Sequence, residues 1–481
     1  MRIFIADDLT GLKDNLQNVV QHWLKHDADE TVEIQRDETP VQIVLSSLTR
    51  TQATAPSAGL LAQPEFSAEI LDALGAQLLH LGLVEQAEPF IEAGLRGRIK
   101  QFGKDHPVTA SSYNTRARLH RMKGDVVAAE KDVRRALSIN SRVYGEDSYA
   151  ACVNLTELAI IQVQAGEFGG AERSAVRGLR ILERLYLEET DPNTTRLLDV
   201  LGRVLQMKGL YDDATEIYQR ILQQDAQQAG SEYSLKYATH LANFATVLLS
   251  KRNYADADRF FRQAIEIYSK KASVPNHPDL LDIRSGYASS LAEQKNPSAR
   301  DEYRKLIELG AKLRGDDHPY VGNDHAGLAR AIYQSEQGNF LEEALAEFDK
   351  ALGIYHKNVD AKRMPDDHAF IAEAKGWKAR IFVEQAGSLD GAERARLASE
   401  AEQLALQALQ KFQAEFAEGS VEIAITRAII ARALFLQGKE RERALALLKA
   451  AQEIVVPVRG ANSRIARLIS AWIAEFEKKR S

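Results

Sequence analysis

Residues 121–137 read RMKGDVVAAEKDVRRAL, a glycine turn followed five residues later by an alanine and then by an Ala-Leu pair. The chain repeats this spacing at steps of 42, 42, 43 and 43 residues, and the turn and alanine positions are Gly82/Ala87, Gly124/Ala129, Gly166/Ala171, Gly209/Ala214 and Arg252/Ala257. The pattern continues less regularly through Lys295/Ala299, Gly338/Ala344, Gly387 and Gly438. A fixed period of this length predicts stacked supersecondary units, each burying its apolar face against its neighbours.

Each unit is predicted to contain two antiparallel helices joined by the turn. A proline at the first helical position needs no N–H and already has a helical φ, so Pro107, Pro192, Pro278 and Pro319 predict helix starts. Seven residues before each turn the first helix carries a small residue, which allows close helix packing. These positions are Gly75, Ala117, Ala159, Gly202, Ala245, Ala288, Ala331 and Ala431.

The small residue, the turn, the second-helix alanine and the closing Ala-Leu pair (Ala136-Leu137, Ala351-Leu352) resemble the tetratricopeptide repeat. The period of about 42, with Gly-Asp-Asp-His-Pro between units at residues 315–319, resembles its long, kinesin-light-chain-like type. The resemblance covers about residues 65–455. It implies an all-α fold, an α-solenoid of about nine antiparallel helix pairs.

The two ends of the chain depart from the repeat. Residues 1–48 alternate apolar strands with one amphipathic helix and predict a small α+β, βαββ-like module, followed by a linker at 49–64. This module is expected to dock on the first repeats, to pair with another copy of the chain, or to pair with a partner through its strand edges. Residues 456–481 predict a capping helix and a basic tail, because a last repeat otherwise exposes its apolar edge.

The composition favours a soluble protein of the cytoplasm. The N-terminus does not read as a secretory signal, and no apolar run is long enough to span a membrane. Cys152 is the only cysteine, so an intrachain disulfide is excluded. The net charge of −6 gives no general attraction to nucleic acid. Nucleic acid is not expected as a partner, because arginines are few and no aromatic ladder interleaves with them.

Catalytic signals are scarce. The chain lacks His-Glu-x-x-His, the phosphate-binding Gly-x-x-x-x-Gly-Lys-Ser/Thr and the Gly-x-Ser-x-Gly elbow. The densest group of histidines and acids, around His318 and His325, lies in and after an inter-repeat turn, where the acids are expected to cap a helix. We therefore expect a non-enzymatic protein without a metal or a cofactor.

The resemblance also implies where a ligand would bind. In tetratricopeptide arrays the first helices line the concave side, and contacts come from fixed positions around the small residue. In this chain we assign to the groove Asp72, Asn114, Arg118, Arg121, Thr156, Ile160, Val163, Arg196, Asp199, Arg203 and Asn243.

Two interpretations of these arginines remain open. Guanidinium groups suit carboxylates and phosphates, so Arg118, Arg121, Arg196 and Arg203 predict an acidic peptide or a terminal carboxylate as the ligand. Alternatively, Arg196 and Arg203 only pair with Asp199 on a solvated face. The sequence predicts a scaffold or adaptor that binds a peptide or protein segment. The alternative function is a regulatory sensor or switch in bacterial signalling or defence, with output through the N-terminal module or a partner docked there.

Overall fold

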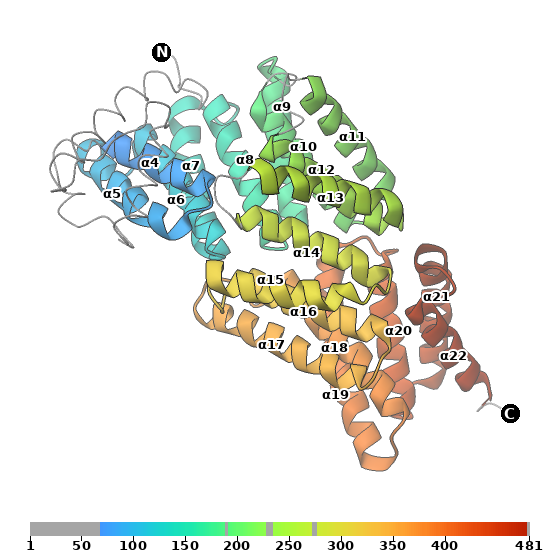
Figure 1. Cartoon of the computed structure of the whole chain (residues 1–481). Helices are drawn as coiled ribbons and strands as arrows, with labels where there is room; N and C mark the ends of the chain where they lie inside the picture. Colours follow the sequence, from blue (N-terminus) through green and yellow to red (C-terminus); the bar gives the residue numbers. More distant parts are fainter. Residues whose placement is uncertain (1–67, 188–190, 228–233, 272–276, 479–481) are drawn as a thin grey trace, which may run out of the picture. The chain divides into compact units, whose positions relative to one another are not determined.

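The chain was analysed as a computed structural model that describes residues 68–187, 191–227, 234–271 and 277–478 (Figure 1). Within these ranges the regular secondary structure is helical throughout, with nineteen helices labelled α4 to α22. They form nine antiparallel pairs followed by one last helix. The expected all-α repeat array is therefore present, whereas the α+β module predicted for residues 1–48 lies outside the described residues.

Each pair consists of a first and a second helix. The first helices are α4 (Ala68–His80), α6 (Pro107–Met122), α8 (Tyr149–Gln164), α10 (Pro192–Met207), α12 (Leu235–Ser250), α14 (Pro278–Glu293), α16 (Pro319–Ser335), α18 (Ala369–Gly387) and α20 (Val421–Leu436). The second helices are α5 (Val84–Phe102), α7 (Val126–Tyr144), α9 (Phe168–Arg184), α11 (Tyr211–Gln227), α13 (Tyr254–Lys271), α15 (Ser298–Arg314), α17 (Phe340–Asp360), α19 (Gly391–Glu415) and α21 (Arg441–Arg459). The last helix is α22 (Arg464–Lys478).

The helices group into two compact units. The first unit runs to Met122 and includes Lys131–Glu146, so it holds α4, α5, α6 and most of α7. The second unit comprises Lys123–Glu130 and the chain from Asp147 onward, with α8 to α22. Each unit is described by itself.

The predicted prolines do begin first helices, and the residue before them supplies a cap. The carboxylate of Asp191 accepts a hydrogen bond from the Asn193 backbone N–H at 2.8 Å. The imidazole Nδ1 of His277 and that of His318 each accept one from the N–H two residues on, at 3.2 Å. An imidazole nitrogen can accept only while it carries no proton, so these caps require that Nδ1 be unprotonated. The sequence indicated the helix starts but not this use of histidine.

In seven of the nine pairs, a residue with a positive φ lies in the turn seventeen positions after the first residue of the first helix. These residues are Gly124, Gly166, Gly209, Arg252, Lys295, Glu336 and Gly438. Glycine suits this left-handed conformation best, and polar residues take it at a cost.

One prediction of register is wrong here. In the turn after α16 both Glu336, with φ of 53°, and Gly338, with φ of 62°, are left-handed, and Glu336, not Gly338, stands at the spacing that the other first helices show. The loop to α17 is longer than the corresponding loops to α9, α11 and α13, so the second helix starts late. Counting back seven residues from Glu336, the small residue of α16 is Ala329 instead of Ala331, and Ala329 is fully buried.

Small residues of one helix receive large residues of a neighbouring helix, within a pair or in the preceding pair. A Cβ atom on Gly202 of α10 would lie 2.7 Å from Cε2 of Tyr218 in α11, and one on Gly286 of α14 would lie 2.8 Å from Cε1 of Phe261. Tyr218 and Phe261 are both buried. The fit between a missing side chain and an aromatic ring sets the spacing of the helices, as the small-residue pattern predicted.

The later repeats are longer. The charge-rich residues that the sequence adds between Ser388 and Gln403 extend α19, which has 25 residues. They therefore lengthen one second helix without adding another element.

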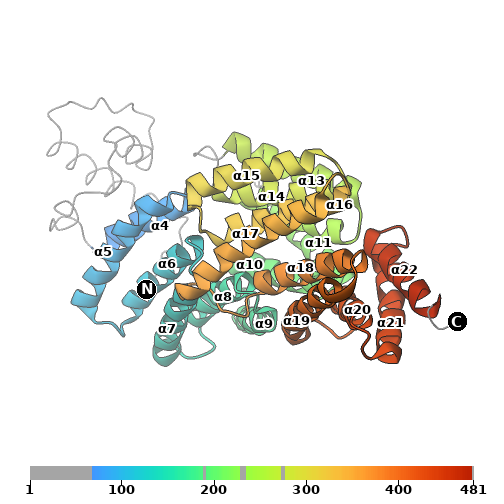
Figure 2. The same cartoon turned by 90° about the horizontal axis from the view of Figure 1, so that it is seen from below.

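Inside the second unit, the turn between α8 and α9 contacts the much later helices α16, α18 and α19 (Figure 2). The side-chain amide of Gln164 donates to the Tyr320 hydroxyl at 2.9 Å, and the backbone carbonyl of Gln164 lies 2.8 Å from Nε2 of His368. The ring of Phe168 stacks on that of Phe416 with centroids 6.0 Å apart. These contacts fasten the third pair to the seventh and eighth pairs.

Candidate binding surface on the first helices

The first helices of the second unit form one side of the array. Along most of the unit, consecutive first helices pack on one another, while consecutive second helices are held apart. Helices that are closer on one side bend a stack toward that side, so the first helices form its inner layer. We call the side of the first helices that faces away from the second helices the inner face. Its residues are placed relative to the buried small residue of each helix.

The position directly after the small residue forms a row along the inner face. With the corrected register of α16, its members from α8 to α20 are Ile160, Arg203, Thr246, Ser289, Arg330, Arg380 and Arg432. Four of these seven side chains are guanidinium groups. The sequence prediction included Ile160 and Arg203 and missed the last three arginines. Arg330 could have been found from the sequence, because it follows the small residue Ala329. Taking Gly338 as the turn residue moved the predicted small-residue position of this helix by two residues, to Ala331.

Arg196 of α10 has a partner that the sequence did not indicate. Its guanidinium donates to Glu157 of α8 at 2.6 Å, and the Glu157 side chain is only 5% exposed. The prediction that Arg196 pairs with Asp199 is therefore wrong in its partner. Because a buried carboxylate already occupies it, Arg196 has less capacity to receive an acidic ligand.

Asp199 is held by two neutral donors instead of by arginines. It accepts from the hydroxyl of Tyr218 at 3.0 Å and from Nδ2 of Asn243 at 2.7 Å. Burial raises the pKa of the Tyr218 phenol well above its ordinary value, and the charge of Asp199 adds to this effect. The phenol therefore stays protonated and remains a donor to Asp199.

Arg203 is the arginine of α10 without a carboxylate partner. It is partly buried and forms no ion pair or hydrogen bond with any residue that the structure describes. The charge of Arg203 also acts on Asp282 of α14, but the Asp282 carboxylate accepts a hydrogen bond from Arg314 at 2.7 Å.

The other two predicted residues of α8 do not reach the surface. Thr156 is fully buried and donates to the Cys152 carbonyl at 3.0 Å, and Val163 is buried as well. Ile160 is partly exposed. Of the two apolar residues of α8 that the sequence assigned to the groove, Ile160 remains available to a ligand, while Val163 packs inside the array.

In the first unit, the predicted residues lie on α4 and α6. Asp72 is buried beside Arg98, with 3.1 Å between Arg98 Nη1 and Asp72 Oδ2, and burial raises its pKa against the charge of Arg98. Asn114, Arg118 and Arg121 are partly buried on α6. Oδ1 of Asn114 and Nε of Arg121 are buried atoms without a hydrogen-bond partner in the described part of the chain. The assignment of these residues to a groove stays a prediction.

The histidines that the sequence singled out have structural partners. His318 caps α16, and His325 lies 2.6 Å from Glu347 of α17. Among the described residues, no three His, Cys, Asp or Glu side chains come together as they would around a metal ion. Cys152 is fully buried, and its pKa is raised to about 12. Burial is the main cause, and the negative charge of Asp191 raises the pKa further.

Residues 66–139 and 193–270 match the family model of the tetratricopeptide repeat. The chain contains tetratricopeptide repeats. The two matched segments include parts of both units. Between and after them, the structure shows further helix pairs of the same kind. No protein of established function matches the chain as a sequence.

Several solved structures resemble this chain at low identity. The apo form of the quorum sensor NprR from B. thuringiensis is 13% identical, covers 83% of this chain and 99% of its own, and has a TM-score of 0.45. NprR in complex with its cognate peptide NprX is 12% identical, with coverages of 82% and 99% and a TM-score of 0.49. BtubC from P. vanneervenii is 18% identical, with coverages of 56% and 95% and a TM-score of 0.35. Similarity at this level carries no argument about ligands.

None of the helices in the described ranges is both long and apolar enough to cross a membrane.

Proposed function

We propose that this protein binds a peptide or an extended protein segment on the inner face of its second unit, and that Arg203 receives an acidic group of that ligand. One observation carries the proposal. Arg203 is a partly buried guanidinium without an acceptor among the described residues, whereas its neighbour Arg196 is neutralised by Glu157. The guanidinium donors of Arg203 are therefore available to a ligand, and a carboxylate would accept from two of them at once.

The surroundings of Arg203 suit an extended chain. Ile160 offers an apolar contact in the preceding first helix, and Thr246 and Ser289 offer small polar surfaces in the two following ones. Nδ2 of Asn243 is committed to Asp199, so its Oδ1 is the atom that can accept from a peptide N–H. Small polar side chains leave room for a backbone, and a pre-formed rigid surface lowers the entropic cost of binding one.

The alternative function, a regulatory sensor or switch, concerns output through residues 1–48. That module lies outside the described residues, and the alternative stays a prediction.

The proposal is tested by selecting ligands from a displayed library of random peptides with the full-length protein. We expect selected peptides to carry Asp, Glu or a required terminal carboxylate. Reversing the charge with Arg203→Glu should weaken their binding by roughly 10- to 100-fold, because it removes a charge-assisted pair and adds a repulsion. Affinity is measured by fluorescence anisotropy with labelled peptides.

Arg259→Glu is the matched control. Arg259 lies on the second helix α13, and its side chain is 66% exposed. It pairs with Asp256 at 2.9 Å and lies 4.6 Å from the ring centroid of Phe260. Arg259→Glu changes the net charge of the protein by the same amount as Arg203→Glu. It should leave the affinity for the peptides within about twofold of the wild type, since exposed ion pairs contribute little. Selected peptides without acidic groups, or equal affinities for wild type and Arg203→Glu with an unchanged circular dichroism spectrum, would refute the proposal.

A further inference from the structure

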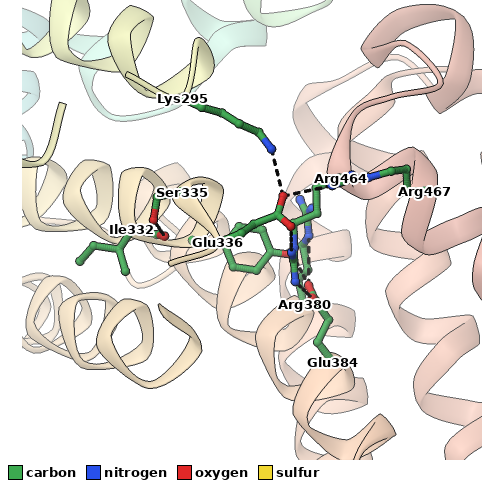
Figure 3. A network of polar contacts seen from close by, with 9 residues as sticks. Lys295, Ile332, Ser335, Glu336, Arg380, Glu384, Arg464 and Arg467 are labelled. Carbon is green, nitrogen blue, oxygen red and sulfur yellow. Dashed lines mark hydrogen bonds and ion pairs between the residues drawn. The ribbon is translucent and has the colours of Figure 1, made fainter. Parts of the chain in front are cut away.

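A cluster of charged side chains joins the ends of α14 and α16 to α18 and α22 (Figure 3). At its centre, Glu336 ends α16 and receives three cations. Its carboxylate lies 3.0 Å from Nζ of Lys295, 2.8 Å from Arg464 and 3.0 Å from Arg467. Burial acts to raise the pKa of Glu336, but the hydrogen bond from Lys295 and the charges of Arg464 and Arg467 outweigh it and hold the pKa below its ordinary value.

The second carboxylate of the cluster is fully occupied. Glu384 of α18 has a side chain only 6% exposed. Its Oε1 accepts from the hydroxyl of Tyr333 and its Oε2 accepts from Arg464. Both oxygens therefore have a partner before Arg380, the remaining cation, is considered.

Arg380 is left without a hydrogen bond in the described part of the chain. Its side chain is 8% exposed, and the closest carboxylate oxygen, Oε1 of Glu384, is 3.9 Å from its Nε. That distance is too long for a hydrogen bond. Nε itself is buried and unpaired. The guanidinium is instead fixed over two rings, 4.7 Å from the centroid of Tyr333 and 4.9 Å from that of Trp377. It is a buried cation with unused donors.

The cluster has more positive than negative charge. Four cations, Lys295, Arg380, Arg464 and Arg467, face two carboxylates, Glu336 and Glu384, which leaves a net charge of +2. The C-termini of α14 and α16 add partial negative charge that cations near them offset. Arg380 lies in the interior of α18, so these termini do not account for it.

We propose that this cluster binds a dianionic oxyanion, a phosphate group. Arg380 and Arg464 approach the two oxygens of the same Glu384 carboxylate, Arg380 at 3.9 Å from Oε1 and Arg464 in a hydrogen bond to Oε2, so their guanidinium groups converge on one small region. Nε of Arg464 is also buried and unpaired. Several converging donors need more acceptor oxygens than the two of a carboxylate, and a dianion matches the charge of +2. The half-exposed Lys295 and Arg467 leave the cluster open to solvent on one side.

This inference is independent of the proposed function, because it uses neither Arg203 nor α10. It has one structural consequence. Arg464 is the first residue of α22 and Arg380 belongs to α18, so a phosphate bound to both would hold the last helix on the array. Phosphate would then stabilise the full-length protein and protect α22 in particular.

The test titrates inorganic phosphate into the full-length protein and measures binding by calorimetry, thermal unfolding, and hydrogen exchange of residues 464–478. Sodium chloride and sodium acetate at matched ionic strength are the reference salts. We expect saturable binding, a higher melting temperature and slower exchange in phosphate only. O-phosphoserine in place of phosphate distinguishes the two sources of the group: tighter binding of O-phosphoserine points to a phosphorylated ligand, and tighter binding of phosphate to the free ion.

Arg380→Met keeps the length and the packing on Tyr333 and Trp377 but removes the charge. It should fold and lose at least tenfold in phosphate affinity, whereas Arg304→Met, at a 58% exposed side chain of α15, should lose less than twofold. Glu336→Gln should bind phosphate more tightly because the cluster then carries +3. If Arg380→Met does not fold, the exposed double variant Lys295→Gln/Arg467→Gln replaces it and should weaken binding by a similar factor. An equal response to acetate and phosphate, or an undiminished response in the folded variants, would overturn the proposal.

Discussion

His368 should make the contact between the third and eighth pairs sensitive to acid. The side chain is 1% exposed and caps α18, with its Nδ1 accepting from the Phe370 backbone N–H at 3.1 Å. On its other side, Nε2 donates to the Gln164 carbonyl at 2.8 Å. Both bonds together require the neutral ring with its proton on Nε2, since a second proton on Nδ1 would abolish the cap.

The folded state disfavours protonation of His368. Burial lowers its pKa to about 4, helped by the charge of Lys411, while the bond to the Gln164 carbonyl and the charge of Asp367 act in the opposite direction. The unfolded pKa is about 6.5. A folded pKa below the unfolded one means that the contribution to stability is complete above pH 6.5 and is lost as the pH falls toward 4. At pH 5 the loss is about 2 kcal/mol, or roughly a 30-fold change in the opening equilibrium.

The assay is hydrogen exchange by mass spectrometry on peptides that cover the start of α18 and the end of α8, at pH 8 and pH 5. The comparison variant is His368→Asn, because asparagine also caps helices but does not titrate. Between the two pH values, protection in the wild type should fall about 30-fold more than in this variant. His356→Asn, at an exposed position of α17, is the control and should behave as wild type. The same pH dependence in wild type and His368→Asn would refute the reasoning.

Three further predictions concern single side chains. Tyr186 has φ of 57° and is 89% exposed, so Tyr186→Gly should raise the free energy of unfolding by about 1 kcal/mol in thermal or urea unfolding, whereas Tyr186→Ala should not. Burial raises the pKa of Asp324 to about 7, against a hydrogen bond from Ser285, so its ionisation costs stability increasingly from pH 4 to 7. Asp324→Asn should therefore increase the free energy of unfolding at pH 8 by up to about 4 kcal/mol, seen as a higher melting temperature, and this gain should disappear near pH 4. A gain that is independent of pH would contradict this reasoning. Cys152 should react with an aromatic disulfide reagent at pH 8 about a thousandfold more slowly than a free thiol, and at the ordinary rate in urea.

The pairing of helices could be predicted because its signals are local. Turn glycines, N-terminal prolines and small residues act within one or two helices, and their period places the elements without knowledge of distant contacts. The predicted register was wrong at α16, where the turn is longer. Gly338 was taken as the residue that follows the first helix, whereas Glu336 occupies that position. A left-handed glutamate gives no sequence signal comparable to a glycine, so the register there depended on the structure.

The side-chain partners could not be predicted in the same way. Arg196 and Asp199 share a helix face, yet Arg196 pairs with Glu157 and Asp199 with Asn243, each in a neighbouring first helix. Which neighbour a long side chain reaches depends on the offset between stacked helices, which a one-dimensional period does not contain. Arg203 was assigned to the surface from sequence, but only its surroundings show that it has no acceptor there.

By itself, then, the sequence determined the fold class, the helix starts and the repeated alternation of small and large residues, because each of these follows from interactions over fewer than about fifty residues. Only the tertiary structure decided which charges are satisfied and which are not. His368 meets Gln164 across 204 residues, and Arg464 meets Glu336 across more than a hundred. Small rotations between successive repeats add up over several pairs to bring such residues together, and that sum is a property of the packed array and not of any one repeat.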